Sequence, residues 1–261
     1  NQVNQNLDNT ILGIMTSTSI VTVYSIALTL YTCFISLVTA LSNMFAPKAT
    51  KLVAKGASGE QLTDFVIGPG RIQTLVALLG ILGFVVVGKD FIRIWMGEGF
   101  DDVYVITLIL IIPALIPLIE SVTNTILDAL MKRMARSIAL LGMCVINVAA
   151  SIILLKMIGF IGAAIGTAIS VIVGHGIIIN LYLQRGIGLN IPRMFKEIFK
   201  GLLPAFVLCL IIGYLISLIP GQNIMIFVIK VILLVIEYSI IMYSIGMNKA
   251  EKQYIKNMIK R

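Results

Sequence analysis

A long apolar stretch from Val103 to Arg133 constrains this chain more than any other feature of its sequence. Its first half is almost purely apolar, and the whole segment is long enough for one membrane-spanning helix of about 20–25 residues. Pro113 and Pro117 lie one helical turn apart, so a kink is predicted at these residues. The stretch closes with Lys132 and Arg133, which is typical of a cytoplasmic helix end.

Three polar residues follow the predicted kink on one face of this helix. Glu120, Asn124 and Asp128 are spaced four residues apart, which stacks them above one another. A charge near the middle of a membrane costs at least about 2.5–3.5 kcal/mol unless it meets water or a partner. The three residues are therefore candidates for the wall of a transport cavity, where a carboxylate such as Glu120 could bind H⁺ or Na⁺. The alternative is a hydrogen-bonded pair or triad between helices.

The composition is that of a polytopic all-α membrane protein. Of the 261 residues, 59% are hydrophobic and 12% are charged, which is about half the charge of a soluble domain. Residues 1–15 are too short for a span and are either a solvated tail or the end of a helix whose beginning is missing. We expect the chain to be part of a longer protein. Seven complete spans are predicted, within residues 20–45, 72–88, 103–133, 138–157, 161–183, 202–219 and 224–245.

The net charge of +8 comes from basic residues in alternate loops and not from one basic domain. Most of the 20 Lys and Arg residues fall in 47–71, 132–136, 184–200 and the tail after Gly246. The positive-inside rule therefore predicts that these segments and the C-terminus are cytoplasmic, and no nucleic-acid partner is expected. Residues 47–71 are predicted to form a loop, in which Ser58 and Gln61 make a capping box for a short helix.

Apolar and basic residues alternate in IPRMFKEIFK, residues 191–200, with the apolar ones on one helical face. This pattern predicts a short amphipathic helix on the inner leaflet, with membrane lipids as partners. The last span holds Lys230 and Glu237, which lie about 10 Å apart along a helix and cannot pair directly. Lys230 is expected to reach outward to the interface, whereas Glu237 needs a partner or water.

The first complete span carries a continuous polar stripe, which is either a close-packing seam between helices or one wall of a hydrated cavity. Its members are Thr22, Ser25, Thr29, Thr32, Ser36, Thr39 and Asn43. The chain has no CxxC motif and no pair of histidines, so we expect no metal site, no cofactor and no disulfide. His175 is the single histidine and is expected to be a packed or hydrogen-bonded residue.

Four motifs, in order, resemble the C-terminal half of polysaccharide flippases of the multidrug/oligosaccharidyl-lipid/polysaccharide exporter superfamily. They are similar to the family's seventh helix running into its eighth, the proline-led exit of the eighth, an outer loop, and the glycine-rich turn into the twelfth. The motifs are LDNTILGIMTSTSIVTVYSIA at 7–27, PKATKL at 47–52, FIRIWMGEGF at 91–100 and GFIGAAIGTAIS at 159–170. Of these residues, the resemblance carries over Asp8 as a cavity or coupling position.

The resemblance implies one lobe of a two-lobe exporter, with a C-terminal lobe in 1–183, an interfacial linker in 184–200, and two trailing helices with a basic tail in 201–261. An N-terminal lobe of the same protein would complete a V around a hydrated cavity. The implied activity is alternating-access flipping of a polyprenyl-pyrophosphate-linked oligosaccharide in the bacterial plasma membrane. No strongly basic cluster for pyrophosphate lies within these spans.

Other functions remain open at this point. A multidrug exporter or a cell-wall lipid-precursor flippase of the same superfamily is the nearest alternative, although the loop at 91–100 and the two extra helices favour a sugar-lipid substrate. A membrane-embedded glycosyl- or acyltransferase would need catalytic groups on aqueous loops. The only such cluster is Asp90, Glu98, Asp101 and Asp102, without a DxD or histidine motif. A transporter is therefore favoured over an enzyme or a structural subunit.

Overall fold

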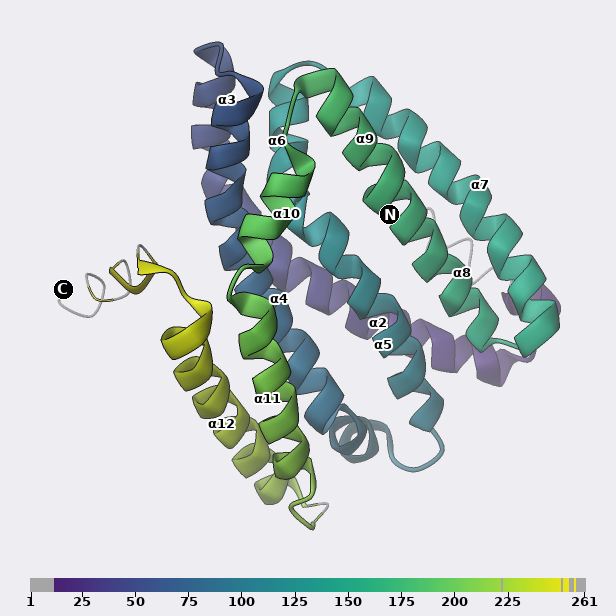
Figure 1. Cartoon of the computed structure of the whole chain (residues 1–261). Coiled ribbons are helices and arrows are strands. Elements are labelled where there is room, and N and C mark those ends of the chain that lie inside the picture. Colours follow the sequence, from purple (N-terminus) through teal and green to yellow (C-terminus); the bar gives the residue numbers. More distant parts are fainter. Residues whose placement is uncertain (1–11, 222, 250, 254–255, 257–261) are drawn as a thin grey trace.

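The chain forms a bundle of long helices packed side by side (Figure 1) in a computed structural model that describes residues 12–221, 223–249, 251–253 and 256. These described residues contain helices and no strands. Six helical segments among them are long and apolar enough to cross a membrane, or seven if a bent pair at Ile191–Phe199 and Leu202–Ser217 counts as one span. The predicted class, an all-α polytopic bundle, is confirmed.

Helices cover each of the predicted spans, although some of them extend beyond it or are interrupted within it. Four short segments depart from α-helical geometry. Of these, η1 is a 3₁₀ helix, and η2, η3 and η4 are π-helices. The elements are α2 (Thr18–Ala40), η1 (Ser42–Phe45), α3 (Ala46–Ala54), α4 (Gly59–Met96), α5 (Asp101–Ile119), α6 (Ser121–Ala129), α7 (Arg133–Ile158), α8 (Ile161–Val171), η2 (Ile172–Ile179), α9 (Asn180–Tyr182), η3 (Leu183–Ile187), α10 (Ile191–Phe199), α11 (Leu202–Ser217), α12 (Ile224–Ile241) and η4 (Met242–Gly246).

Helix α4 is much longer than the sequence indicated and replaces most of two predicted loops. Its 38 residues extend for about 57 Å. The predicted capping box is confirmed. The backbone N–H of Gln61 donates to the Ser58 hydroxyl, and the backbone N–H of Ser58 donates to the side-chain oxygen of Gln61. This capping box opens α4, however, and not a separate short helix. The prediction of a loop over 47–71 was wrong because Leu62 and Val66 pack in the core and hold this segment helical.

The predicted amphipathic segment is indeed helical, as α10, but protein covers much of its apolar face. Ile191, Met194 and Ile198 are buried in a cluster that includes residues of α4 and α6. The approach to α4 is close, since a Cβ on Gly70 would lie 2.6 Å from the Ile198 side chain. The position of α10 at the inner leaflet stays a prediction. The buried apolar residues of α10 attach it to the bundle.

Gly162 and Gly166 of α8 lie where α7 and α8 approach each other closely. A Cβ on Gly166 would lie 2.5 Å from the Ser151 hydroxyl, and one on Gly162 would lie 2.4 Å from the Leu154 carbonyl oxygen. Only glycine leaves room for α7 and α8 to pack at this distance.

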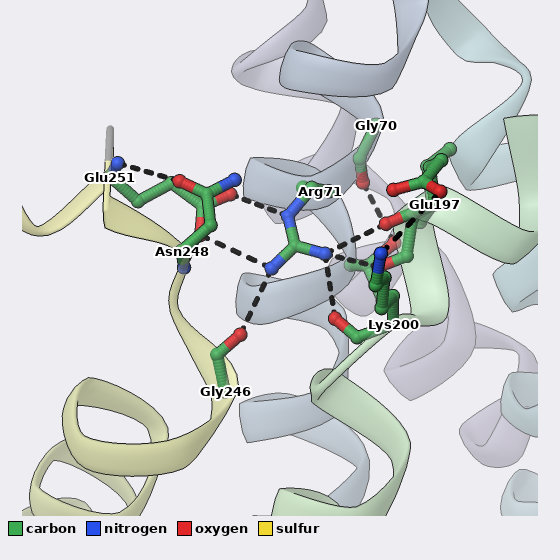
Figure 2. A network of polar contacts seen from close by, with 9 residues as sticks. Gly70, Arg71, Glu197, Lys200, Gly246, Asn248 and Glu251 are labelled. Atoms are coloured by element: carbon green, nitrogen blue, oxygen red, sulfur yellow. Dashed lines mark hydrogen bonds and ion pairs between the residues drawn. The ribbon is translucent and has the colours of Figure 1, made fainter.

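A buried arginine on α4 joins three parts of the chain (Figure 2). Arg71 is 4% exposed, and its guanidinium donates to the carbonyls of Glu197 and Lys200 at the end of α10, each at 2.8 Å. It also donates to the Gly246 carbonyl at 2.9 Å and to the Glu251 carboxylate at 2.6 Å. The last carbonyls of a helix lack partners and carry partial negative charge, so one cation satisfies two helix ends at once.

A second buried ion pair joins α4 to α12 at the other end of these helices. The Lys230 ammonium donates to the Asp90 carboxylate at 2.7 Å, and Lys230 is 3% exposed. The expectation that Lys230 reaches out to the interface was therefore wrong, because Asp90 lies within α4 and meets it inside the bundle. Arg71 and Asp90 are about 28 Å apart along α4, close to the roughly 30 Å thickness of the hydrocarbon core.

The Lys230 and Asp90 side chains should prove energetically coupled. Lys230→Met leaves a carboxylate without its cation, and Asp90→Asn leaves the ammonium without its anion, so each single change should destabilise the protein. The double variant should lose less than the sum of the two, by about 0.5–3 kcal/mol. Thermal unfolding of the four proteins in detergent measures this coupling, and additive losses would show that the pair contributes nothing.

Candidate functional site

The centre of the candidate site is Glu120, which lies between the end of α5 and the start of α6, where the regular pattern of α-helical hydrogen bonds is interrupted. The Glu120 carbonyl accepts from the Thr123 amide at 2.9 Å and from the Thr123 hydroxyl at 2.6 Å, and α6 begins from this turn. Pro113 and Pro117, the predicted kink residues, both lie inside α5. The break thus falls beyond the prolines, at the carboxylate itself.

Glu120 is completely buried and pairs with the one histidine of the chain. Its Oε2 lies 2.9 Å from Nδ1 of His175, and the two residues are 0% and 5% exposed. His175 lies in η2, a π-helical stretch of a kind that occurs frequently at functional sites. Asn180 follows and donates to the His175 carbonyl at 3.0 Å, which ties its side chain to the same turn.

Glu120 and Asn180 each have one side-chain oxygen that accepts no hydrogen bond from the described residues. Oε1 of Glu120 and Oδ1 of Asn180 are buried and have no partner among the described residues. Both atoms are oxygen acceptors, and a buried acceptor without a donor is unfavourable by about 1–3 kcal/mol. A proton on Glu120, an ordered water or a small cation would each relieve this cost.

The other predicted site residues are not gathered around Glu120. Asn124 and Asp128 lie on α6 and are half-buried, so only Glu120 of the three enters the core. Both carboxylate oxygens of Glu237 are buried without a hydrogen-bond partner among the described residues, next to the Cys209 thiol of α11. Asp8 lies outside the described residues.

A neighbouring polar cluster was missed from the sequence. Gln73 of α4 contacts Ser42 of η1, and its amide donates to the Ser121 hydroxyl of α6 at 2.8 Å. The two serine hydroxyls are 2.6 Å apart. Because Ser121 directly follows Glu120, this cluster holds the α5–α6 break against two further elements. A lone glutamine within an apolar span was the available signal for it.

A second buried cluster joins α7 and α8 through hydroxyl and amide groups. The Ser151 hydroxyl donates to the Asn147 side-chain oxygen at 2.9 Å, and the Thr167 hydroxyl donates to the same oxygen at 3.2 Å. Asn147 and Ser151 are fully buried. Asn147 lies near the middle of the predicted span at 138–157, and the sequence does not indicate these partners.

The polar stripe of α2 faces away from the rest of the described bundle. Its buried side is formed by Tyr24, Ala27, Leu28 and Val38. Thr22, Thr29, Thr32 and Ser36 are exposed instead. Each of these four hydroxyls donates to the carbonyl four residues earlier, at 2.8–3.0 Å, which lowers the cost of placing them in an apolar span. The stripe is therefore not a packing seam between helices of the described chain.

Together these features define a polytopic helical membrane protein with ionisable and amide groups buried between its spans, an arrangement characteristic of transporters. No protein-family model matches the chain. It is similar to the probable flippase AglR of Haloferax volcanii, with 30% identity over 179 residues that cover 64% of this chain and 36% of that protein.

Among solved structures, the fold is similar to that of the lipid II flippase MurJ in an inward closed conformation. The TM-score is 0.73 at 16% identity, over 99% of this chain and 52% of the MurJ chain. The chain therefore spans about half the length of the flippase structure and about a third of the length of the curated relative. The sequence comparison supports the resemblance to flippases, and the structural comparison shows a similar fold.

Proposed function

We propose that this chain is one lobe of a flippase that carries a lipid-linked oligosaccharide across the membrane by alternating access. The observation that carries the proposal is the exposed hydroxyl stripe of α2, on a chain with the fold of half a lipid II flippase. On this proposal the stripe lines a hydrated path, which a second, N-terminal lobe of the same protein closes from the other side.

The chemistry of the stripe suits a sugar headgroup. A serine or threonine hydroxyl that donates to its own helix still has a lone pair, so it can accept a hydrogen bond from a sugar hydroxyl. Such bonds contribute only about 0.5–1.5 kcal/mol each, so the headgroup is held weakly enough to move on. The polyprenyl tail stays in the lipid throughout.

The Glu120–His175 pair is the proposed coupling site. Binding of H⁺ or Na⁺ at Glu120 changes the charge inside the bundle and so the balance between two packings of α5, α6 and η2. The α-helical hydrogen-bond pattern is already interrupted at Glu120, and η2 has the wider turns of a π-helix. These segments can therefore shift without breaking a regular α-helix.

We place the protein in the plasma membrane with its basic segments and C-terminus in the cytoplasm. The basic connections around residues 46–58, 130–133 and 184–190 lie at one end of the bundle in Figure 1. The connections at 97–100, 159–160 and 218–221 lie at the opposite end. This separation fits the positive-inside rule.

A cell-wall lipid-precursor flippase is the second candidate, because the matched structure is itself a lipid II flippase. The two candidates differ in the headgroup and share the same path. A binding experiment distinguishes the two candidate functions. In it, lipid II and a polyprenyl-pyrophosphate oligosaccharide compete for binding to the purified protein.

The hydrated path can be tested with a cysteine that the chain already carries. Cys33 lies on α2 beside the stripe, and its thiol is free and exposed. In a Cys144→Ser/Cys209→Ser background, we expect a charged, membrane-impermeant thiol reagent to label Cys33, and a bound lipid-linked oligosaccharide to slow the labelling. Only the thiolate reacts, and it forms in water but not in hydrocarbon.

The matched control is Ile232→Cys in a background that also lacks Cys33, at a position on α12 that is 52% exposed on an apolar face. This thiol should face lipid and stay unlabelled. If Cys33 is as unreactive as the control, the stripe faces lipid and the proposed path is wrong.

A further inference from the structure

A groove on the side of the bundle lies between α6, α7 and the continuous helical segment formed by η2 and α9. It has a volume of about 450 Å³ and is almost entirely apolar. Leu127, Ala139 and Ile179 form its buried floor, whereas Ile138 and Ile178 are exposed at its rim. Figure 1 shows α7 at the edge of the bundle, beside α8 and α9. The groove is within the size range of ligand pockets, which is roughly 300–1,000 Å³.

Among the described side chains that line this apolar groove, Arg136 is the cationic one. Arg136 lies in the first turn of α7, and its Nε is buried without a hydrogen-bond partner among the described residues. A guanidinium has five donors and no acceptor, so only an acceptor, and best an anion, can satisfy it. A buried N–H without an acceptor is unfavourable, and Arg136 is only half-buried, so an anion in the groove can reach its guanidinium and supply the acceptor.

The position of Arg136 along the span narrows the class of ligand. Arg136 is the last charged residue before a stretch of α7, residues 137–155, that carries no charge and is predicted to cross the membrane. The cation therefore lies at the level of the lipid headgroups, and the apolar groove extends from it along the acyl-chain region. Lys132 and Arg185 are exposed nearby, at the same basic end of the bundle.

We propose that this groove binds an anionic phospholipid of the inner leaflet, with its phosphate on Arg136 and an acyl chain along Ala139, Gly142 and Ile178. A phosphodiester carries one negative charge, which matches one guanidinium, whereas a pyrophosphate would need more cationic groups than the described side chains place in this groove. The site is separate from the α2 stripe and from the Glu120–His175 pair, and it does not rest on the proposed transport function.

Glycine 142 offers a way to fill the groove without disturbing the fold. A Cβ at Gly142 meets no other atom within 4 Å, so a leucine there extends into open space. Leucine also has a higher helix propensity than glycine. Gly83 of α4 is equally open and does not line the groove, so Gly83→Leu is the matched control.

The experiment is native mass spectrometry of the delipidated protein, purified from its own membrane, titrated with phosphatidylglycerol and with phosphatidylcholine. The wild-type protein should retain one phosphatidylglycerol in preference to phosphatidylcholine. Arg136→Gln should weaken that binding about tenfold, because it removes a charge-assisted hydrogen bond. Gly142→Leu should also lose it, while Gly83→Leu and Arg185→Gln, which removes a neighbouring exposed charge, should bind as the wild type.

Three results would overturn the proposal. In the first, Arg136→Gln binds phosphatidylglycerol as tightly as the wild type. In the second, Arg185→Gln loses as much affinity for phosphatidylglycerol as Arg136→Gln, which would show that binding depends on the general positive charge of this surface and not on Arg136. In the third, equimolar polyprenyl pyrophosphate displaces the phospholipid, which would assign the groove to a transported lipid instead.

Discussion

Glu120→Gln is expected to lower transport at least about fivefold while the protein still reaches the membrane at its normal level. Glutamine keeps an oxygen that can accept from Nδ1 of His175, so the buried contact and the fold should survive. It cannot ionise, so the binding of H⁺ or Na⁺ that we propose at this position is lost. Export of the lipid-linked oligosaccharide in cells, normalised to the amount of protein in the membrane, measures the effect.

The matched control is Glu98→Gln, which neutralises an exposed carboxylate in the turn between α4 and α5. This variant should export normally. The variant His175→Asn then tests whether export needs a titratable partner for Glu120, since asparagine keeps a hydrogen-bond donor near the position of Nδ1 but does not titrate. Unchanged export by Glu120→Gln would remove the pair from the mechanism and leave it as a purely structural contact.

Arg71→Ala should destabilise the protein by about 3–5 kcal/mol. The change leaves the Glu251 carboxylate and the carbonyls at the ends of α10 and η4 without their common donor. Arg71→Lys should recover only part of the loss, because an ammonium cannot reproduce the planar fork of the guanidinium. Thermal unfolding in detergent measures the stability of each variant.

A buried thiol gives a local measurement of the same effect. Cys209 of α11 is 0% exposed and lies in the cluster shared by α4, α11 and α12. Its reaction with a thiol dye should become much faster in Arg71→Ala, because the trailing helices open more often when their anchor is removed. Arg193→Ala breaks an exposed pair with Asp64 and should cost less than about 1 kcal/mol. Equal effects of the two changes would contradict an anchoring role for Arg71.

The C-terminal part of the chain is anchored to α4 at two levels, near Arg71 and near Asp90, which has a mechanical consequence. Arg71 with Glu251 and Lys230 with Asp90 fix the helices in one register over about the thickness of the membrane. Between them, the Tyr238 hydroxyl donates to the Leu75 carbonyl at 2.6 Å. The two trailing helices should therefore move as one body with α4.

The sequence by itself determined the class of the protein and the positions of its spans. A bilayer satisfies no backbone hydrogen bonds, so a run of about 20 apolar residues has to become a helix. The pattern of hydroxyls on α2 also indicated a polar face, and Ser58 with Gln61 indicated a helix start, because both signals are local. The ends of α4 were misjudged, since packing extended a helix through polar segments.

The tertiary structure alone decided which polar groups meet. Glu120 pairs with His175, 55 residues away, and Arg71 with Glu251, 180 residues away. Lys230 was expected at the interface and instead meets Asp90 inside the bundle. The spacing of residues along one helix shows which side chains share a face, but the rotation of that helix against its neighbours selects their partners.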